Sequence, residues 1–197
     1  MEGRAYVFQD CLKDKVGTMS LLGKIADKKR LELIEEEIFE PNFQKFVKAI
    51  IPIKLKILDL GCGDGWLVKE LNKHNFIEAM GIDPNLKEEA KDLLRISTHA
   101  FPDNYFDYIV AIEVIEHLEP KMYEEIRRIL KPNGKLIVTS PKPKWNWVVE
   151  FLCWIGLADP LITPHMNVVN PEDLPFKIIK KQDYLLIEWF GVFENEK

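Results

Sequence analysis

A glycine-rich turn flanked by an acid is the part of this sequence best suited to chemistry. Gly61, Gly63 and Gly65 follow the short apolar run 57–60, which contains one carboxylate, Asp59. Such a run is typical of a strand buried on both faces of a sheet. Glycine lets the backbone turn sharply and leaves no side chain between the main chain and a ligand. We therefore expect a ligand to approach bare main chain at this turn.

The residues after the turn predict a helix. Asp64 can cap it, and Leu67, Val68 and Leu71 form its apolar side. A strand, a glycine turn and a helix in this order form a nucleoside-binding crevice, with backbone N–H groups at the helix N-terminus. The dinucleotide fingerprint G-x-G-x-x-G would require a third glycine where this chain has Trp66. The spacing therefore favours a nucleoside ligand and argues against a dinucleotide.

A second carboxylate, Asp83, follows the next predicted strand, 79–82. At the tip of that strand it can accept hydrogen bonds from both hydroxyl groups of a ribose. A solvated turn aspartate is the alternative, but the position relative to the glycine turn favours the ribose contact. Asn85 and Glu88 have the spacing of a helix start, which predicts a helix that ends by Leu94, and a short third strand over 95–98.

Two further polar side chains follow a fourth strand, which is predicted over 108–112 because this run is rich in branched residues. Ligands of open α/β sheets bind where the strand order reverses, so the end of this strand should lie beside the glycine turn. Glu113 and His117 emerge there. His117 is the candidate general base, because histidine titrates near neutrality. A structural hydrogen bond is the alternative role for this histidine.

Three stretches resemble one family. D-L-G-C-G-D-G resembles motif I of the class I S-adenosylmethionine-dependent methyltransferases. The run over 101–120 resembles the F-P-D-x-x-F-D segment of small-molecule and quinone-biosynthesis methyltransferases in this class, as does L-K-P-N-G-K-L-I-V. The resemblance covers roughly residues 55–141. It implies an α/β fold: a doubly wound, mainly parallel, seven-stranded Rossmann-like sheet with an antiparallel C-terminal edge.

The resemblance also implies S-adenosyl-L-methionine as the cofactor and S-adenosyl-L-homocysteine as its product. The backbone of 60–65 would approach the amino-acid part of the cofactor, Asp59 would orient the turn or the cofactor's ammonium, and adenine would lie near 97–99. Many members carry a Gly-Asp pair for the adenine where this chain has Leu94 and Arg95. The implied cofactor-binding residues are Asp59, Leu60, Gly61, Cys62, Gly63, Gly65, Asp83, Pro84, Ser97, Thr98 and Ile112.

Methyl transfer is an in-line displacement, so the protein supplies orientation, exclusion of water and a base for an acceptor proton. His117 and Glu113 are the predicted catalytic residues, with no metal. As an alternative, Glu113, Glu116 and His117 have an E-x-x-E-H spacing similar to the metal-binding group of small-RNA 2'-O-methyltransferases, with His165 as the fourth ligand. A cofactor-binding partner subunit without acceptor chemistry is a third interpretation.

Composition limits the partners. The net charge of -5 provides no general attraction for nucleic acid, so we expect a small-molecule acceptor. The three cysteines show no C-x-x-C spacing, which argues against disulfides and structural zinc and for a cytoplasmic location. No apolar run reaches the ~18 residues of a membrane span.

The remaining elements flank this centre. Helices predicted over 24–39 and 41–51 form an N-terminal helical cap, 1–52, in front of a methyltransferase domain, 53–197, within one compact unit. They could cover the substrate pocket or simply pack on the sheet. A tryptophan-rich helix over 145–158 is expected to be buried on the sheet; an acceptor pocket, a homodimer surface and a membrane-facing patch are the alternatives.

The last part of the chain predicts one more helix and three strands. A helix with an apolar face at 122–130 is followed by a fifth strand over 136–140. Strands over 176–180 and 185–193 can then pair antiparallel.

Overall fold

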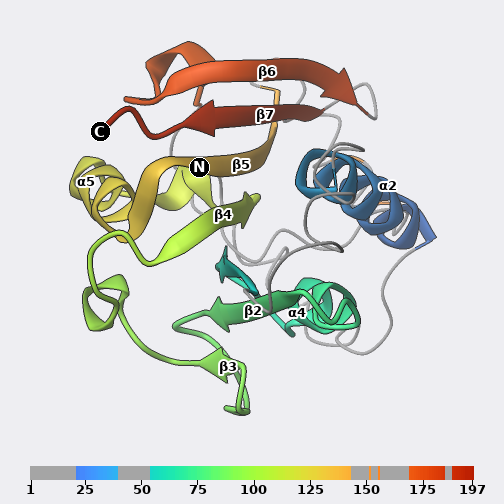
Figure 1. Cartoon of the computed structure of the whole chain (residues 1–197). Helices are drawn as coiled ribbons and strands as arrows, with labels where there is room; N and C mark the ends of the chain where they lie inside the picture. The colour runs from blue at the N-terminus through green and yellow to red at the C-terminus, as the bar shows by residue number, and fades with distance from the viewer. Residues whose placement is uncertain (1–20, 40–53, 143–150, 152–154, 156–168, 185–187) are drawn as a thin grey trace, which may run out of the picture.

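The computed structural model describes residues 21–39, 54–142, 151, 155, 169–184 and 188–197. In this part of the chain seven strands form one sheet in the order β3-β2-β1-β4-β5-β7-β6 (Figure 1). The strands are β1 (Leu55–Leu60), β2 (Ile77–Ile82), β3 (Leu93–Leu94), β4 (Phe106–Ile112), β5 (Leu130–Pro141), β6 (Lys177–Tyr184) and β7 (Glu188–Glu194).

The sheet is parallel from β3 to β5, and β7 runs antiparallel to both β5 and β6. The predicted doubly wound, mainly parallel sheet with an antiparallel C-terminal edge is therefore confirmed. The chain moves outward from β1 to β2 and β3, then returns to place β4 on the other side of β1. The strand order thus reverses between β1 and β4, and a ligand crevice is expected at the carboxyl ends of these two strands.

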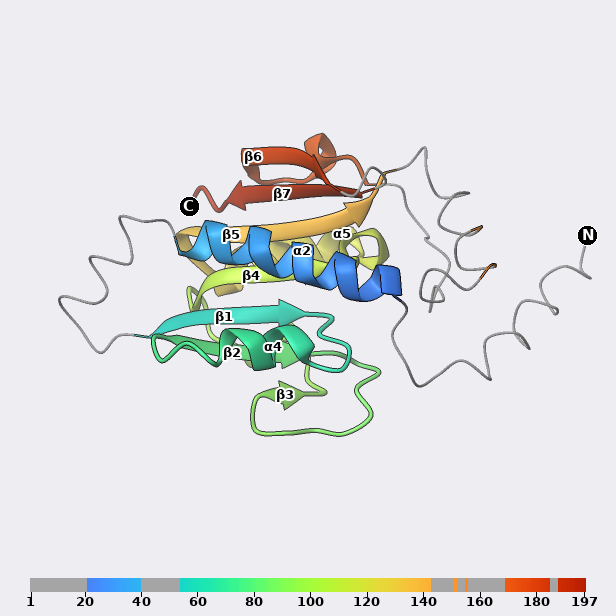
Figure 2. The same ribbon diagram turned by 90° about the vertical axis from the view of Figure 1, so that its right-hand side faces the viewer.

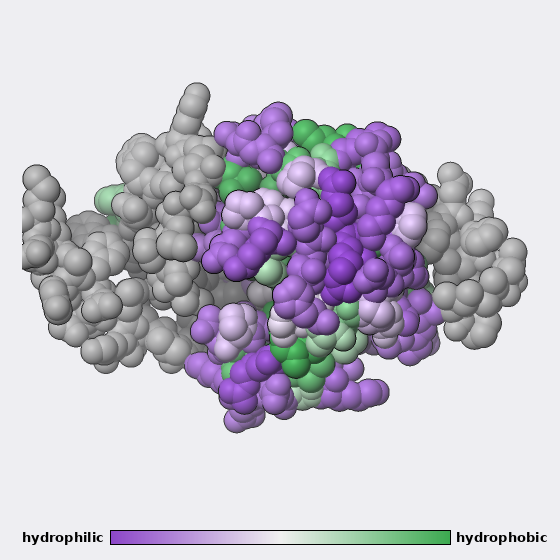
Figure 3. Space-filling model, turned by 90° about the vertical axis from the view of Figure 1, so that its left-hand side faces the viewer, coloured by the Kyte–Doolittle hydropathy of each residue, from purple (hydrophilic) through white to green (hydrophobic). Residues whose placement is uncertain are grey.

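Helices cover both faces of the sheet. Helices α2 (Leu21–Ile38) and α4 (Trp66–Leu71) lie on one face, and α5 (Pro120–Ile129) lies on the other (Figures 1 and 2). Each face has its own buried cluster, with Ile57, Val110 and Ile137 under α2 and α4, and Leu58, Ile109 and Val138 under α5. Figure 3 shows the α5 side, whose described surface is mostly hydrophilic. Among the described residues, three single 3-10 turns, η1 (Thr98–Ala100), η2 (Ile115–His117) and η4 (Pro171–Asp173), connect these elements.

Helix α2 packs directly on the sheet. Leu33, Ile34 and Ile38 are buried in the same cluster as residues of β1, β4, β5 and β7. The buried side of the helix also includes two charged residues, Arg30 and Glu37, and the Glu37 carboxylate accepts a 2.6 Å hydrogen bond from Lys135 on β5. The helix predicted over 24–39 is confirmed. Of its two predicted roles, covering the substrate pocket and packing on the sheet, the structure shows the packing. The helix predicted over 41–51 and the boundary at 52/53 lie outside the described residues.

The helix predicted between Asn85 and Leu94 is wrong. Asp83 accepts a 2.7 Å hydrogen bond from the Asn85 amide, and this local turn competes with helix formation. Leu93 and Leu94 form the edge strand β3 instead, so the third strand comes earlier than the predicted 95–98. The connection from β2 to β3 is consequently an irregular segment, with Leu86 buried as its anchor.

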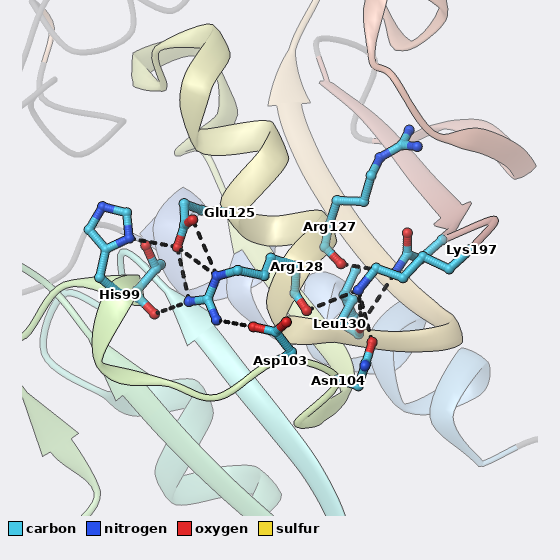
Figure 4. A network of polar contacts seen from close by, with 10 residues as sticks. His99, Asp103, Asn104, Glu125, Arg127, Arg128, Leu130 and Lys197 are labelled. Atoms are coloured by element: carbon cyan, nitrogen blue, oxygen red, sulfur yellow. Dashed lines mark hydrogen bonds and ion pairs between the residues drawn. The ribbon is translucent and has the colours of Figure 1, made fainter.

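The residues after β7 form hydrogen bonds with the C-terminal end of α5 (Figure 4). The fully buried Asn195 donates through Nδ2 to the carbonyl oxygens of Arg127, Leu130 and Lys131, at 3.0, 3.2 and 3.2 Å. Lys197 donates to the carbonyl oxygens of Arg128 and Leu130. The last carbonyls of a helix have no partner within the helix, so these two side chains complete its C-terminal end.

Two further predictions concern the C-terminal part. The antiparallel pair predicted over 176–180 and 185–193 is confirmed by β6 and β7. The helix predicted over 145–158 lies outside the described residues, except for Phe151 and Ile155, which are exposed. Among the helices that the structure describes, none is both long and apolar enough to cross a membrane.

Candidate functional site

The glycine turn after β1 is held by the end of β2. The amides of Gly61 and Cys62 donate to the carbonyl oxygen of Ile82 at 2.8 and 3.2 Å, and the amide of Gly65 donates to the carbonyl oxygen of Cys62 at 2.8 Å. All three glycines have positive φ, at 75°, 55° and 75°. Residues that carry a side chain rarely adopt positive φ, so the path of the turn favours glycine at these positions.

The three glycines have different surroundings. A Cβ atom added to Gly61 would lie 2.3 Å from Cγ2 of Val114, and one added to Gly65 would lie 2.5 Å from the Leu93 side chain. A Cβ added to Gly63 would meet nothing within 4 Å. Two glycines therefore allow close packing inside the protein, while the third presents bare main chain to open space.

Asp83 lies at the open side of this turn. Its Oδ2 accepts a 3.0 Å hydrogen bond from the amide of Gly63, and its Oδ1 accepts from the amide of Asn85. A carboxylate has about four acceptor positions, so capacity remains for a ligand. The structure thus brings the glycine turn and the acid after β2 together, as the sequence predicted.

Asp59 lies beneath the turn and is 3% exposed. Burial raises the pKa of its carboxyl to about 7, and the charges of Asp83 and Asp64 add to this shift. The nearby Cys62 thiol is also buried, and burial together with these acids raises its pKa to about 12. Cys62 therefore remains a neutral thiol, whereas Asp59 is poised to ionise when a cation approaches.

The residues predicted near adenine lie after β3. Ser97 is exposed, and its hydroxyl caps η1 by accepting from the His99 amide, while the Thr98 side chain is buried. The His99 ring points toward α5, where its Nδ1 lies 2.7 Å from the Glu125 carboxylate (Figure 4). The amide of Asp83 donates to the carbonyl oxygen of Leu94, which joins this segment to the turn after β2.

The other predicted contacts occupy the ends of β1, β2 and β4. Leu60 is the buried last residue of β1, and Pro84 is exposed directly after Asp83. Ile112 is the half-buried last residue of β4. All three therefore lie at the edge where the crevice is expected.

Glu113 leaves β4 in a left-handed conformation, with φ at 52°. Its carboxylate pairs with Arg30 of α2, and the same guanidinium pairs with Glu188 at 3.1 Å and Asp27 at 3.0 Å. Burial raises the pKa of Glu113 and the charge of Arg30 opposes the rise, while the neighbouring Glu188 and Glu116 add to it. Arg30 and Glu188 were not predicted from the sequence, because partners 83 and 158 residues apart produce no local spacing signal.

Glu116 and His117 form part of η2, directly beyond Glu113. Glu116 is buried, accepts a 3.2 Å hydrogen bond from Ser140, and has a raised pKa because of its burial. His117 is half-buried. In the described part of the chain no three His, Cys, Asp or Glu side chains form a group that could hold a metal, and His165 lies outside that part.

A family model described as a methyltransferase domain matches residues 22–175 of this sequence. The chain belongs to this methyltransferase family. Together with the sheet order, the match places this methyltransferase domain in class I, the S-adenosylmethionine-dependent class that its sequence motifs resemble.

Individual relatives agree with this assignment. A sterol 24-C-methyltransferase of Neurospora crassa is 34% identical over 115 residues, which cover 46% of this chain and 29% of that protein. A ubiquinone biosynthesis O-methyltransferase of Rhodopseudomonas palustris is 26% identical over 149 residues, covering 68% of this chain and 58% of that protein. The chain thus spans less than two thirds of the length of these relatives.

The fold also matches solved structures. An S-adenosylmethionine-dependent methyltransferase from Aquifex aeolicus superimposes with a TM-score of 0.51 at 18% identity, covering 84% of this chain and 97% of that one. S-adenosylmethionine is the expected cofactor of the methyltransferase domain. The residues present fit it: open main chain at Gly63, a carboxylate with spare acceptor positions at Asp83, and a buried acid at Asp59.

Proposed function

We propose that this methyltransferase domain transfers the methyl group of S-adenosylmethionine to a small acceptor molecule. The observation that carries the proposal is the 3.0 Å hydrogen bond between the Gly63 amide and the Asp83 carboxylate. It places open main chain and a carboxylate side by side at the carboxyl ends of β1 and β2, where open α/β sheets bind nucleosides.

In this proposal the residues of the chain bind and orient. The open main chain at Gly63 lies against the amino-acid part of the cofactor, Gly61 and Gly65 fix the path of the turn, and Asp83 accepts hydrogen bonds from the ribose hydroxyls. Asp59 balances the cofactor's ammonium from below. Pro84, Ser97, Thr98 and Ile112 line the adenosine. The bound cofactor supplies a methyl carbon on a sulfonium, which is already a good leaving group.

His117 is proposed as the base that takes a proton from the acceptor. Its half-buried place in η2, one turn beyond β4, keeps the ring close to the carboxyl edge of the sheet. Replacing His117 with Gln should lower kcat by about 100-fold and leave the Kd of S-adenosylhomocysteine unchanged, since general bases contribute about 100- to 10,000-fold. An unchanged kcat would assign His117 a structural role.

The acceptor is proposed to be apolar. The names of the two relatives refer to sterols and to ubiquinone biosynthesis. Both names point to apolar ring compounds, which is why these classes are the first to test.

The cytoplasmic location and the homodimer stay predictions from the sequence.

Isothermal titration with S-adenosylhomocysteine tests the proposal. The wild-type protein should bind with a micromolar Kd, and Asp83→Ala should weaken binding by about 100-fold, because hydrogen bonds to a charged group contribute about 1.5–3 kcal/mol each. Asp103→Ala is the matched control. Asp103 is an exposed acid in the turn before β4, so it lies at the amino end of that strand, whereas the proposed site lies at the carboxyl ends. Absence of binding by the wild-type protein, or equal binding by Asp83→Ala, would contradict the proposal.

A further inference from the structure

Arg30 of α2 connects three segments that are far apart in the sequence. The side chain is buried, with 8% of the residue exposed. Its guanidinium pairs with Asp27 on the same helix, with Glu113 after β4 and with Glu188 at the start of β7. Because a guanidinium is planar and carries five donors, it can hold several carboxylates in fixed positions at once.

The segment that Arg30 holds has an unusual backbone. Glu113 has φ at 52°, which is uncommon for a residue with a side chain and persists where surrounding contacts fix it. Its amide donates to the Thr139 carbonyl oxygen at 2.9 Å. The Thr139 bond fixes the main chain and the Arg30 pair fixes the side chain, so together they determine the direction in which the chain leaves β4.

The next residue, Val114, lies against the glycine turn. A Cβ atom on Gly61 would come within 2.3 Å of its Cγ2 and 3.2 Å of its Cγ1. The position of Val114 therefore sets how far the turn after β1 can move toward β4. A continuous set of contacts leads from Arg30 through Glu113 and Val114 to Gly61. Figure 2 shows α2 on the sheet face over β4 and β5, from where this connection starts.

We propose that Arg30 is a positioning residue for the glycine turn: by holding Glu113, it fixes the segment whose Val114 side chain shapes the turn at Gly61. Helix α2 then contributes to the cofactor site without touching the cofactor. The effect on cofactor binding rests on the proposed function, whereas the coupling between Arg30 and the turn is a property of the ligand-free protein.

Hydrogen exchange of the ligand-free protein tests the coupling. In Arg30→Met, which keeps much of the aliphatic stem, exchange of the amides in 61–66 and 113–118 should accelerate about tenfold. Exchange in the centre of β4 and β5 should stay as in the wild-type protein. Arg30→Lys should give an intermediate result, because an ammonium cannot hold three carboxylates in the same geometry.

Lys29→Met is the matched control, since Lys29 is the neighbour of Arg30 on α2 and pairs with Glu32 at the surface. It should leave exchange in 61–66 unchanged. Equal exchange at 61–66 in Arg30→Met and the wild-type protein, or a uniform acceleration over the whole sheet, would overturn the proposal. If Arg30→Met does not fold, Glu113→Gln decides by the same comparison, because it weakens the same ion pair at its other end.

Titration with S-adenosylhomocysteine gives the second measurement. Arg30→Met should raise the Kd about tenfold, and Lys29→Met should leave it within about twofold. An unchanged Kd in Arg30→Met would overturn the effect on the cofactor site. If the wild-type protein does not bind the compound, the proposed function fails, and the exchange measurement still decides whether Arg30 positions the turn.

Discussion

The amide of Gly63 donates to the carboxylate of Asp83 at 3.0 Å, although the two residues follow different strands. The contact forms because β1 and β2 are parallel neighbours in register, with Leu60 opposite Ile82, so that both strands end at the same level. The turn and the acid are thus fixed relative to each other before any ligand binds. A site formed in this way needs little reorganisation on binding.

The two glycines at positions 61 and 63 should respond differently to alanine. Gly61→Ala places a methyl group 2.3 Å from Val114, in addition to the strain of a positive φ. We expect it to lower the free energy of unfolding by about 2–3 kcal/mol or more, since overpacking costs about 1–3 kcal/mol and the positive φ adds about 1–2 kcal/mol. Gly63→Ala meets no neighbour and should cost about 1–2 kcal/mol through backbone strain alone.

Binding should separate these variants further. Gly63→Ala should lose affinity for S-adenosylhomocysteine although it stays folded, because its methyl group occupies open space at the proposed site. Val114→Ala in the Gly61→Ala background should restore part of the lost stability. Urea unfolding and calorimetric titration measure both effects, and equal unfolding free energies for the two single variants would show that Val114 does not confine the turn.

Asp59→Asn should change how stability depends on pH. The folded-state pKa of Asp59, about 7, is above its ordinary value of 3.8, so the folded state binds the additional proton between these values. Stability from this group therefore falls as pH rises from about 4 to 7 and is level above that. Between pH 5 and 8 the wild-type protein should lose about 2–3 kcal/mol that Asp59→Asn retains.

Urea unfolding of the ligand-free protein at several pH values measures this difference. Asp103→Asn is the control, since its side chain is 68% exposed and should leave the wild-type pH profile unchanged. The same Asp59→Asn variant should bind S-adenosylhomocysteine more weakly at pH 8, because it cannot supply a negative charge. Identical pH profiles for Asp59→Asn and the wild-type protein would refute the buried-acid interpretation.

Asn195→Ala should weaken the attachment of α5. The substitution leaves the carbonyls of Arg127 and Lys131 without their side-chain donor, while the carbonyl of Leu130 keeps only the bond from Lys197. We expect a loss of about 2 kcal/mol in the free energy of unfolding, the range for buried polar groups that lose a partner. Glu196→Ala, at a 63% exposed side chain, should stay within about 0.5 kcal/mol. Equal melting curves for the two variants would contradict this assignment.

Local sequence patterns predicted the centre of the fold because their physical causes are local. The apolar run at 57–60, the glycines after it and the acid at 83 each specify a strand end or a turn, and neighbouring parallel strands then bring them together. The prediction failed over 85–94 for an equally local reason. Helical spacing of apolar residues was present there, but the hydrogen bond from Asn85 to Asp83 and the pairing of Leu93 with Gly81 took precedence.

By itself the sequence determined the alternation of strands and helices outside 85–94, the glycine turn and the carboxylates at 59 and 83. Only the tertiary structure decided that Arg30 pairs with Glu113 and Glu188, and that Val114 lies on Gly61. These contacts join residues 53 to 158 positions apart, and they form only when the elements pack together. Periodicity along the chain records which face of an element is apolar, and it contains no information on which distant residue will meet that face.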